Sequence, residues 1–143
     1  MKMNQIILAS HGLMSAGVKD TAELILGTLP NVYAIAPTRE EKESIDMVAR
    51  RLLNSFDKED HVYVLTDVLG GSVNNNMISL QKEYPDMTII CGMNLCLVLN
   101  LASVDEAVSE EELNEFVEQA REQLMNCSAA IKDAMNLEEE DDL

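Results

Sequence analysis

Two short apolar runs in this chain each lead into a cluster of polar residues and glycines, and this feature constrains the fold most. Residues 5–9 lead into Ser10, His11 and Gly12. Residues 62–65 lead in the same way into residues 66–72, which read Thr-Asp-Val-Leu-Gly-Gly-Ser. Uncharged runs of this kind are typical of parallel strands buried on both faces. Ligands of an open α/β sheet bind outside the carboxyl ends of its strands, so both clusters are predicted to meet at one edge of one sheet.

Strand-like and helix-like segments alternate along the whole chain. Strands are predicted at residues 5–9, 32–36, 61–66 and 88–92. Helices are predicted between and after them, at residues 15–29, 38–56, 74–83, 94–103 and 109–124. This alternation predicts an α/β, doubly wound fold: a mainly parallel central sheet of four strands with helices on both faces.

Local signals set the expected helix starts and the domain borders. Ser15 is the expected N-cap of the first helix, and Thr38 with Glu41 and Ser109 with Glu112 have the spacing of capping boxes. A chain of 143 residues, 47% of them apolar, suffices for one domain with one core. We expect that domain at residues 1–137 and a disordered acidic tail at 138–143, since such a run of like charges stays solvated.

The charge balance excludes some classes of partner. Twenty-six acidic residues against ten basic ones give a formal net charge of −16. Nucleic acid and anionic membrane surfaces are therefore unsuitable partners, because both require lysine and arginine to neutralise phosphates. A basic protein partner is compatible with this charge, and so is a role in solubility alone.

The cysteines and the chain's N-terminus indicate a cytoplasmic protein. Cys91, Cys96 and Cys127 are odd in number and lack zinc-site spacing, so free thiols are expected, buried for the first two. The first four residues do not resemble a signal peptide, and the longest apolar stretch, at 89–101, is too short to span a bilayer.

His11 and Asp67 are the candidate catalytic residues. A histidine at the exit of a buried strand can act as nucleophile, general base or metal ligand, or can merely hydrogen-bond its loop. An aspartate beside an imidazole fixes the ring tautomer and stabilises positive charge on the ring, although Asp67 could also cap its own loop. His61 begins a predicted strand, so we expect it at the opposite edge of the sheet, exposed and without a role.

The glycine loop before the third predicted helix is the candidate anion site. Gly70 and Gly71 let the chain turn with exposed amides, and Ser72 can donate its hydroxyl to the same anion or cap the helix. Gly12 permits close approach of backbone or substrate. Neither a P-loop nor a dinucleotide fingerprint is present, and no cluster of metal ligands or cofactor motif is seen. These parts fit a histidine that itself carries a phosphoryl group, with no metal and no cofactor.

Three motifs in order resemble one known family. They are strand-Ser-His-Gly near the N-terminus, Asp-x-x-Gly-Gly-Ser after the third strand, and Gly-Met-Asn-Leu at 92–95. Together they resemble the enzyme IIA component of the mannose/fructose/sorbose class of the bacterial phosphoenolpyruvate-dependent sugar phosphotransferase system. The resemblance covers residues 3–121.

The resemblance implies a phosphotransferase with a phosphohistidine intermediate. His11 would accept a phosphoryl group from the histidine-containing phosphocarrier protein and pass it to enzyme IIB, which serves the membrane subunits IIC and IID during sugar uptake. Asp67 would orient His11, while Gly12, Gly70, Gly71 and Ser72 would bind the phosphoryl group.

The resemblance also implies a homodimer, formed in some members by exchange of a C-terminal antiparallel strand. Residues 128–135 are the candidate for such a fifth strand here. Val73 stands where the family often has a proline, and the loop geometry is expected to survive because that proline mainly presets the backbone.

Other functions stay open at the level of sequence. One is the phosphotransfer subunit of a dihydroxyacetone kinase system, against which the pair His11 and Gly12 argues, since histidine followed by serine would be expected there. Another is a serine hydrolase with Ser72, His11 and Asp67 as triad, although no Gly-x-Ser-x-Gly elbow is present. A regulatory module that signals through its phosphorylation state and a flavodoxin-like binding domain are further alternatives.

Overall fold

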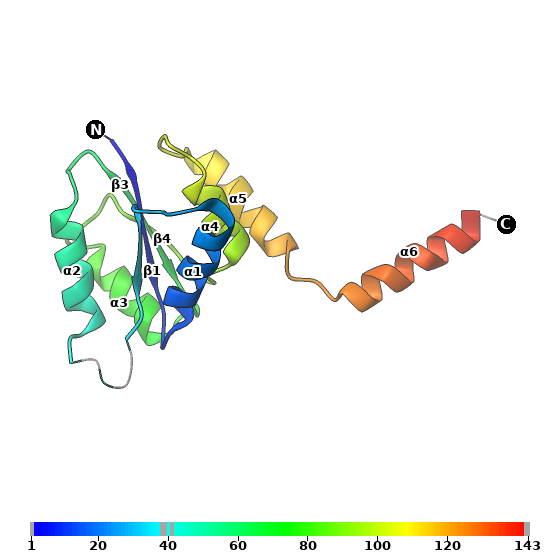
Figure 1. Ribbon diagram of the computed structural model, residues 1–143, viewed down its shortest axis with the longest axis horizontal. Coiled ribbons are helices and arrows are strands. Elements are labelled where there is room, and N and C mark those ends of the chain that lie inside the picture. The colour runs from blue at the N-terminus through cyan, green and yellow to red at the C-terminus, as the bar shows by residue number, and fades with distance from the viewer. Residues whose placement is uncertain (1, 38–39, 41, 142–143) are drawn as a thin grey trace.

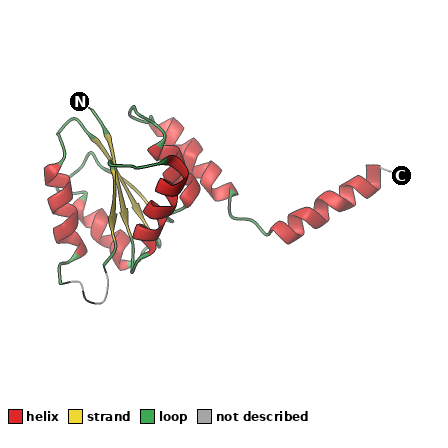
Figure 2. Cartoon of the chain, viewed as in Figure 1, coloured by secondary structure: helices red, strands yellow, loops and turns green. Residues whose placement is uncertain are grey.

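The protein is a four-stranded parallel sheet with helices on both faces (Figures 1 and 2). The computed structural model describes residues 2–37, 40 and 42–141. The strands are β1 (Asn4–Ala9), β2 (Val32–Ile35), β3 (His61–Thr66) and β4 (Thr88–Ile90). The helices are α1 (Met14–Leu26), α2 (Ile45–Ser55), α3 (Ser72–Leu80), α4 (Leu95–Ala102), α5 (Glu110–Glu122) and α6 (Cys127–Asp141). The strand order is β2-β1-β3-β4 with every neighbouring pair parallel, which confirms the predicted fold class.

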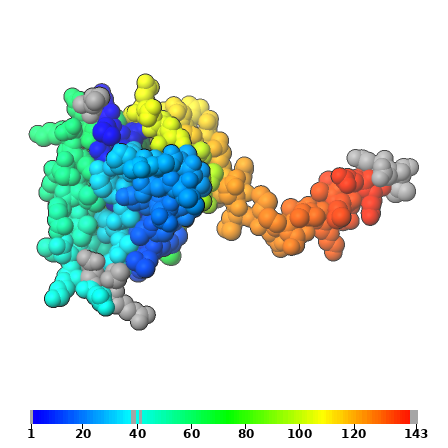
Figure 3. Space-filling model, viewed as in Figure 1, coloured from blue at the N-terminus to red at the C-terminus, as the bar shows by residue number. Residues whose placement is uncertain are grey.

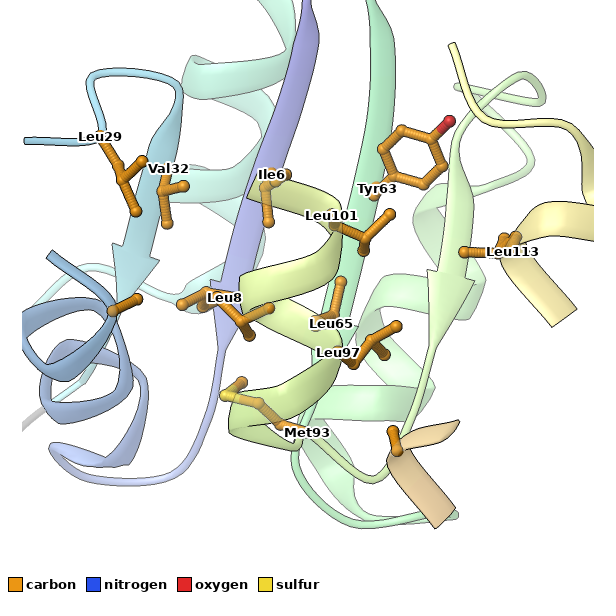
Figure 4. Close-up of a cluster of buried hydrophobic side chains, with 13 residues drawn as sticks. Ile6, Leu8, Leu29, Val32, Tyr63, Leu65, Met93, Leu97, Leu101 and Leu113 are labelled. Carbon is orange, nitrogen blue, oxygen red and sulfur yellow. The ribbon is translucent and has the colours of Figure 1, made fainter. Parts of the chain in front are cut away.

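Successive residues of the central strand β1 point to opposite faces, and each face carries its own core. Ile6 and Leu8 pack under α1, α4 and α5, in the cluster drawn in Figure 4. Ile7 and Ala9 pack under α2 and α3 in a second cluster. Because β1 and most of β3 are buried from both sides, their sequences are almost uninterrupted apolar runs.

The helix starts agree with the sequence in part. Ser109 accepts a hydrogen bond from the N–H of Glu112 at 3.1 Å, so its predicted role as the N-cap of α5 is confirmed, while the Glu112 carboxylate accepts from the Ser109 hydroxyl at 3.3 Å. Helix α2 begins at Ile45, where Ser44 is the cap, and the expected capping box of Thr38 and Glu41 lies outside the described residues.

Ser15 is not the N-cap of α1, as the sequence had suggested. Helix α1 begins one residue before it, at Met14, and Ser15 is fully buried in the first turn. Its hydroxyl donates to the carbonyl of Ile35 at 2.8 Å, while its N–H donates to the Ser10 hydroxyl at 2.8 Å. The hydroxyl of Ser10, and not that of Ser15, therefore accepts a hydrogen bond from a backbone N–H in the first turn of α1.

The C-terminal segment differs from both expectations for it. Residues 128–135, the candidate exchanged strand, belong to α6, and residues 138–141 of the expected disordered tail continue that helix. Alanine, lysine and methionine favour a helix here, and none of the four described strands lies alongside to impose a strand. Helix α6 is exposed and projects from the body of the molecule (Figure 3).

Three smaller findings complete the fold. Cys91 and Cys96 are half-buried rather than buried, and Cys127 is exposed; all three are free thiols. Val73 is fully buried in the core beneath α3. Within the described ranges, no helix combines the length and the hydropathy needed to cross a lipid bilayer.

Candidate active site at the carboxyl edge of the sheet

The order of the strands places the candidate site where the chain changes direction. From β1 the chain first adds β2 on one side and later β3 on the other, so the loops after β1 and β3 leave the sheet side by side. Ala9 lies opposite Thr66 in the register, and His11 and Asp67 follow them directly. This is the topological switch point, at which open α/β sheets bind their ligands.

Asp67 holds His11 by both its main chain and its ring. Oδ2 of Asp67 lies 2.8 Å from the backbone N of His11 and 2.7 Å from its ring Nδ1. The carboxylate is 7% exposed, whereas the imidazole is 59% exposed. The carboxylate therefore fixes Nδ1 as the protonated ring nitrogen and turns Nε2 toward the open edge.

The ionised state of Asp67 is stabilised by these contacts. Burial by itself raises the pKa of Asp67, but hydrogen bonds from the His11 N–H, the His11 ring and the Val68 N–H together outweigh it. The pKa of Asp67 consequently lies below its ordinary value. A carboxylate that stays charged can compensate positive charge on the ring beside it.

Ser72 contacts the other ring nitrogen. Its Oγ lies 3.0 Å from Nε2 of His11, so the hydroxyl can donate to the nitrogen that Asp67 leaves unprotonated. Ser72 is the first residue of α3, and its side chain forms no cap bond there. The N-cap of α3 is therefore Gly71, which has no side chain to donate or accept, and Ser72 does not take the capping role that the sequence left open for it.

The two glycines of the loop have different tasks. Gly70 has a φ of +75°, a left-handed conformation that other residues adopt at a cost. Gly71 lies against the ring: a Cβ there would be 3.7 Å from Cε1 of His11 and 3.2 Å from the Val68 carbonyl. The N–H of Gly71 donates to that carbonyl at 3.0 Å, so this amide closes the turn instead of pointing outward.

Free amides lie one step further along the chain than the sequence had suggested. The first helical bond of α3 runs from Asn75 to Gly71. The N–H groups of Ser72, Val73 and Asn74 therefore occupy the helix terminus, where amides lack intrahelical acceptors and favour an anion. On the opposite loop, Gly12 has a φ of +56° and lets the chain turn from His11 into α1.

The structure brings His11, Asp67 and Ser72 into direct contact, places Gly71 beside the ring of His11, and leaves His61 apart. His61 begins β3 at the opposite edge and is exposed. Asn74, the first of three consecutive asparagines, is 2% exposed, and its Oδ1 accepts a hydrogen bond from the buried Thr66 hydroxyl. Across the described ranges, His, Cys, Asp and Glu side chains do not gather in a group of three or more that could hold a metal ion.

The comparisons with known proteins agree with this arrangement. The family model EIIA-man, described as the PTS system fructose IIA component, matches residues 5–120. The chain belongs to the EIIA-man family. It is an enzyme IIA component of a sugar phosphotransferase system, a phosphoryl carrier in sugar uptake.

Relatives of this family match most of the chain. A fructose-specific EIIA component of Bacillus subtilis is 25% identical over 88% of this chain and 88% of its own length. A sorbose-specific EIIA component of Lacticaseibacillus casei is 24% identical over 96% of this chain and 99% of its own. A Streptococcus pneumoniae PTS IIA protein associated with a fucose utilization operon is 28% identical, with a TM-score of 0.77, over 91% of this chain and 97% of that structure.

Proposed function

We propose that His11 is the residue of this EIIA component that carries the phosphoryl group, on Nε2. The observation that carries the proposal is the pair of contacts on its ring: Nδ1 at 2.7 Å from Asp67 and Nε2 at 3.0 Å from Ser72. With Nδ1 protonated, Nε2 holds a free electron pair, and the 59% exposed side chain is open to a partner protein.

The proposed donor is the phosphohistidine of the histidine-containing phosphocarrier protein. Nε2 of His11 attacks the phosphorus, a new P–N bond forms, and the P–N bond to the donor imidazole breaks. Asp67 compensates the charge on the ring, while the Ser72 hydroxyl turns from Nε2 to a phosphoryl oxygen. Because one imidazole replaces another, positioning and charge stabilisation suffice, and the groups named here need no metal.

The proposed acceptor is a histidine of enzyme IIB, which relays the group to sugar entering through the membrane subunits IIC and IID. Exchange of the phosphoryl group with these partners would take place in the cytoplasm. The net charge of −16 favours partners whose docking surfaces are basic. A dihydroxyacetone kinase system would use the same chemistry at His11 with a different acceptor.

The test is to incubate the protein with phosphoenolpyruvate, enzyme I and the phosphocarrier protein, and to measure its intact mass. We expect one acid-labile phosphoryl adduct on the wild type and on His61→Ala, and none on His11→Ala. An adduct that survives in His11→Ala would overturn the assignment. Adding candidate IIB proteins then identifies the acceptor as the one that removes the adduct.

A serine hydrolase is the second candidate, because Asp67, His11 and Ser72 contact one another in the order of a catalytic triad. In that case Ser72 would be the nucleophile, and a fluorophosphonate would label it. If the protein is the carrier, the wild type takes no such label, and Ser72→Ala still carries the phosphoryl adduct on His11.

We also propose that the protein is a homodimer in solution. Helix α6 is exposed along its described length and carries large apolar side chains, including Ile131, Met135 and Leu137 at 61–62% exposure. A second copy could cover them. Light scattering of the full chain and of a chain ending at residue 125 tests this: the dimer is expected only for the full chain.

A further inference from the structure

A buried hydrogen bond between β3 and α3 lies directly behind the proposed phosphoryl site and has no part in the relay itself. The hydroxyl of Thr66 donates to Oδ1 of Asn74 at 2.8 Å. Thr66 is fully buried and Asn74 is 2% exposed. Buried apolar residues of the same helix, among them Val73 and Met77, belong to the core beneath α3.

The bond closes the loop that supplies both contacts to the His11 ring. Thr66 immediately precedes Asp67, and Asn74 follows Ser72 by two residues. Within the loop between them, the N–H of Gly71 donates to the Val68 carbonyl at 3.0 Å and the Asn75 side chain donates to the Gly70 carbonyl at 3.1 Å, but neither bond reaches β3. The link from Thr66 to Asn74 ties the first turn of α3 to the end of β3.

The strand end to which α3 is tied is itself held on its other side. The carbonyl of Thr66 accepts the N–H of Met93 at 2.8 Å, and the carbonyl of Asp67 accepts the N–H of Gly92 at 3.1 Å. Asp67 therefore sits on an anchored strand end. Ser72 sits on a helix whose first turn depends on Asn74 for a side-chain link to that anchor.

Stability alone gives a weak reason for a polar pair at this position. Replacing both partners of a buried hydrogen bond by apolar groups of similar shape is often nearly neutral for folding. A fully satisfied buried polar pair instead specifies one geometry. The consequence of this pair that stability does not explain is therefore geometric: it fixes one arrangement of α3 against the end of β3.

We propose that Thr66 and Asn74 are positioning residues that set the place of the Ser72 hydroxyl at Nε2 of His11. The inference rests on the proposed function for its consequence in catalysis, because Ser72 is the group that would meet the phosphoryl oxygens. Neither residue touches the reacting atoms. Both act through Ser72.

The test is a double-mutant cycle of Thr66→Val and Ser72→Ala, read as the initial rate of His11 phosphorylation by the phosphorylated carrier protein. Valine has the shape of threonine without its hydroxyl. We expect each single variant to slow transfer about tenfold, since a misplacement of about 1 Å can cost up to roughly a hundredfold. The double variant is expected to be no slower than Ser72→Ala, because Thr66 acts through the hydroxyl that is already missing.

Two variants separate positioning from a loss of stability. Thr66→Ser keeps the hydroxyl and should restore most of the rate. Tyr84→Phe is the matched control. The Tyr84 hydroxyl donates to Oδ1 of Asn54 at a distance of 2.7 Å, in a part of the molecule remote from the site. Loss of this hydroxyl should leave the rate unchanged. The melting temperature of Thr66→Val should fall equally in both backgrounds of the cycle, in contrast to the rate.

A spectroscopic readout tests the inference even where no phosphoryl group is transferred. The ¹⁵N shift of Nε2 of His11 reports the Ser72 contact, and the shift of Nδ1 reports the Asp67 contact. Thr66→Val should move the Nε2 signal alone, and only while Ser72 is present. A Thr66→Val variant that slows transfer equally in the Ser72→Ala background, or leaves Nε2 unmoved, overturns the inference. A wild type without a phosphoryl adduct overturns the proposed function instead.

Discussion

The two edges of the sheet carry nearly the same parts and use them differently. Asp67 and His11 lie at the carboxyl edge, and Asp60 and His61 lie at the amino edge. Each aspartate accepts three hydrogen bonds. Asp60 receives them from the N–H of Met3, the side-chain amide of Gln5 and the N–H of Asp57, at 3.0, 3.0 and 3.3 Å.

The difference between the edges lies in one donor. At Asp60 all three donors are backbone or amide groups, so the carboxylate fastens the start of β1 to the loop before β3. At Asp67 one donor is a ring nitrogen, at 2.7 Å. Burial raises the pKa of both aspartates, but their hydrogen bonds lower it by more, so the pKa of each lies below its ordinary value. A lowered pKa therefore does not identify the site; the titratable partner does.

The largest expected effect comes from changing each aspartate to asparagine. Asp67→Asn removes the charge and the tautomer control of His11, and we expect phosphorylation by the carrier protein to slow at least about a hundredfold, as for aspartates that orient a catalytic histidine. Asp60→Asn should leave the rate within about twofold and lower the free energy of unfolding by about 1 kcal/mol. Quenched-flow rates and urea unfolding of both variants measure this contrast. Equal rate losses would remove the distinction between the edges.

The sequence predicted the carboxyl edge well because its signals are local. A buried strand followed by histidine and glycine, and another followed by aspartate and a glycine pair, place His11 and Asp67 together once the sheet is parallel. The position of Ser72 followed from the glycine pair in the same way.

The contacts that the sequence missed depend on where a helix begins and how its side chains are turned. Three consecutive asparagines look like a solvated face, and nothing local shows that Asn74 points inward to Thr66. The start of α1 was predicted one residue too late, at residue 15 instead of Met14, because it depends on the turn at Gly12. The sequence did not indicate that Asp60 accepts hydrogen bonds from the start of β1, since its donors Met3 and Gln5 are more than fifty residues away in the chain.

A smaller contrast comes from two glycines with left-handed backbones, one at each edge. Gly70 has a φ of +75° in the site loop, and Gly27 has a φ of +89° at the end of α1. Alanine at either position should cost about 1 kcal/mol of unfolding free energy. We expect Gly70→Ala also to slow phosphorylation several-fold, because the loop carries Ser72, whereas Gly27→Ala keeps the wild-type rate. The same two assays test this, and a slowed Gly27→Ala would show that the site responds to stability in general.

The smallest expected effect is on the pH dependence of stability. A carboxylate with a lowered folded-state pKa stabilises the fold fully above its unfolded pKa of about 3.9, and this contribution disappears as the pH falls through the folded-state value. Stability should therefore decline as the pH drops below about 4. Asp60→Asn and Asp67→Asn should each flatten that decline, and their effects should add because the two carboxylates share no partner.

The histidines distinguish the two contributions. His11→Ala removes the ring donor of Asp67, which leaves the backbone donors, so it should flatten the acid-induced decline in part. His61→Ala should leave the decline unchanged, because none of the three groups that donate to Asp60 belongs to His61. Urea midpoints of the wild type and both variants between about pH 3 and 6 span the range in which aspartates titrate. Identical slopes for His11→Ala and the wild type would mean that the ring contributes nothing to the ionisation of Asp67, and the two edges would then be electrostatically alike.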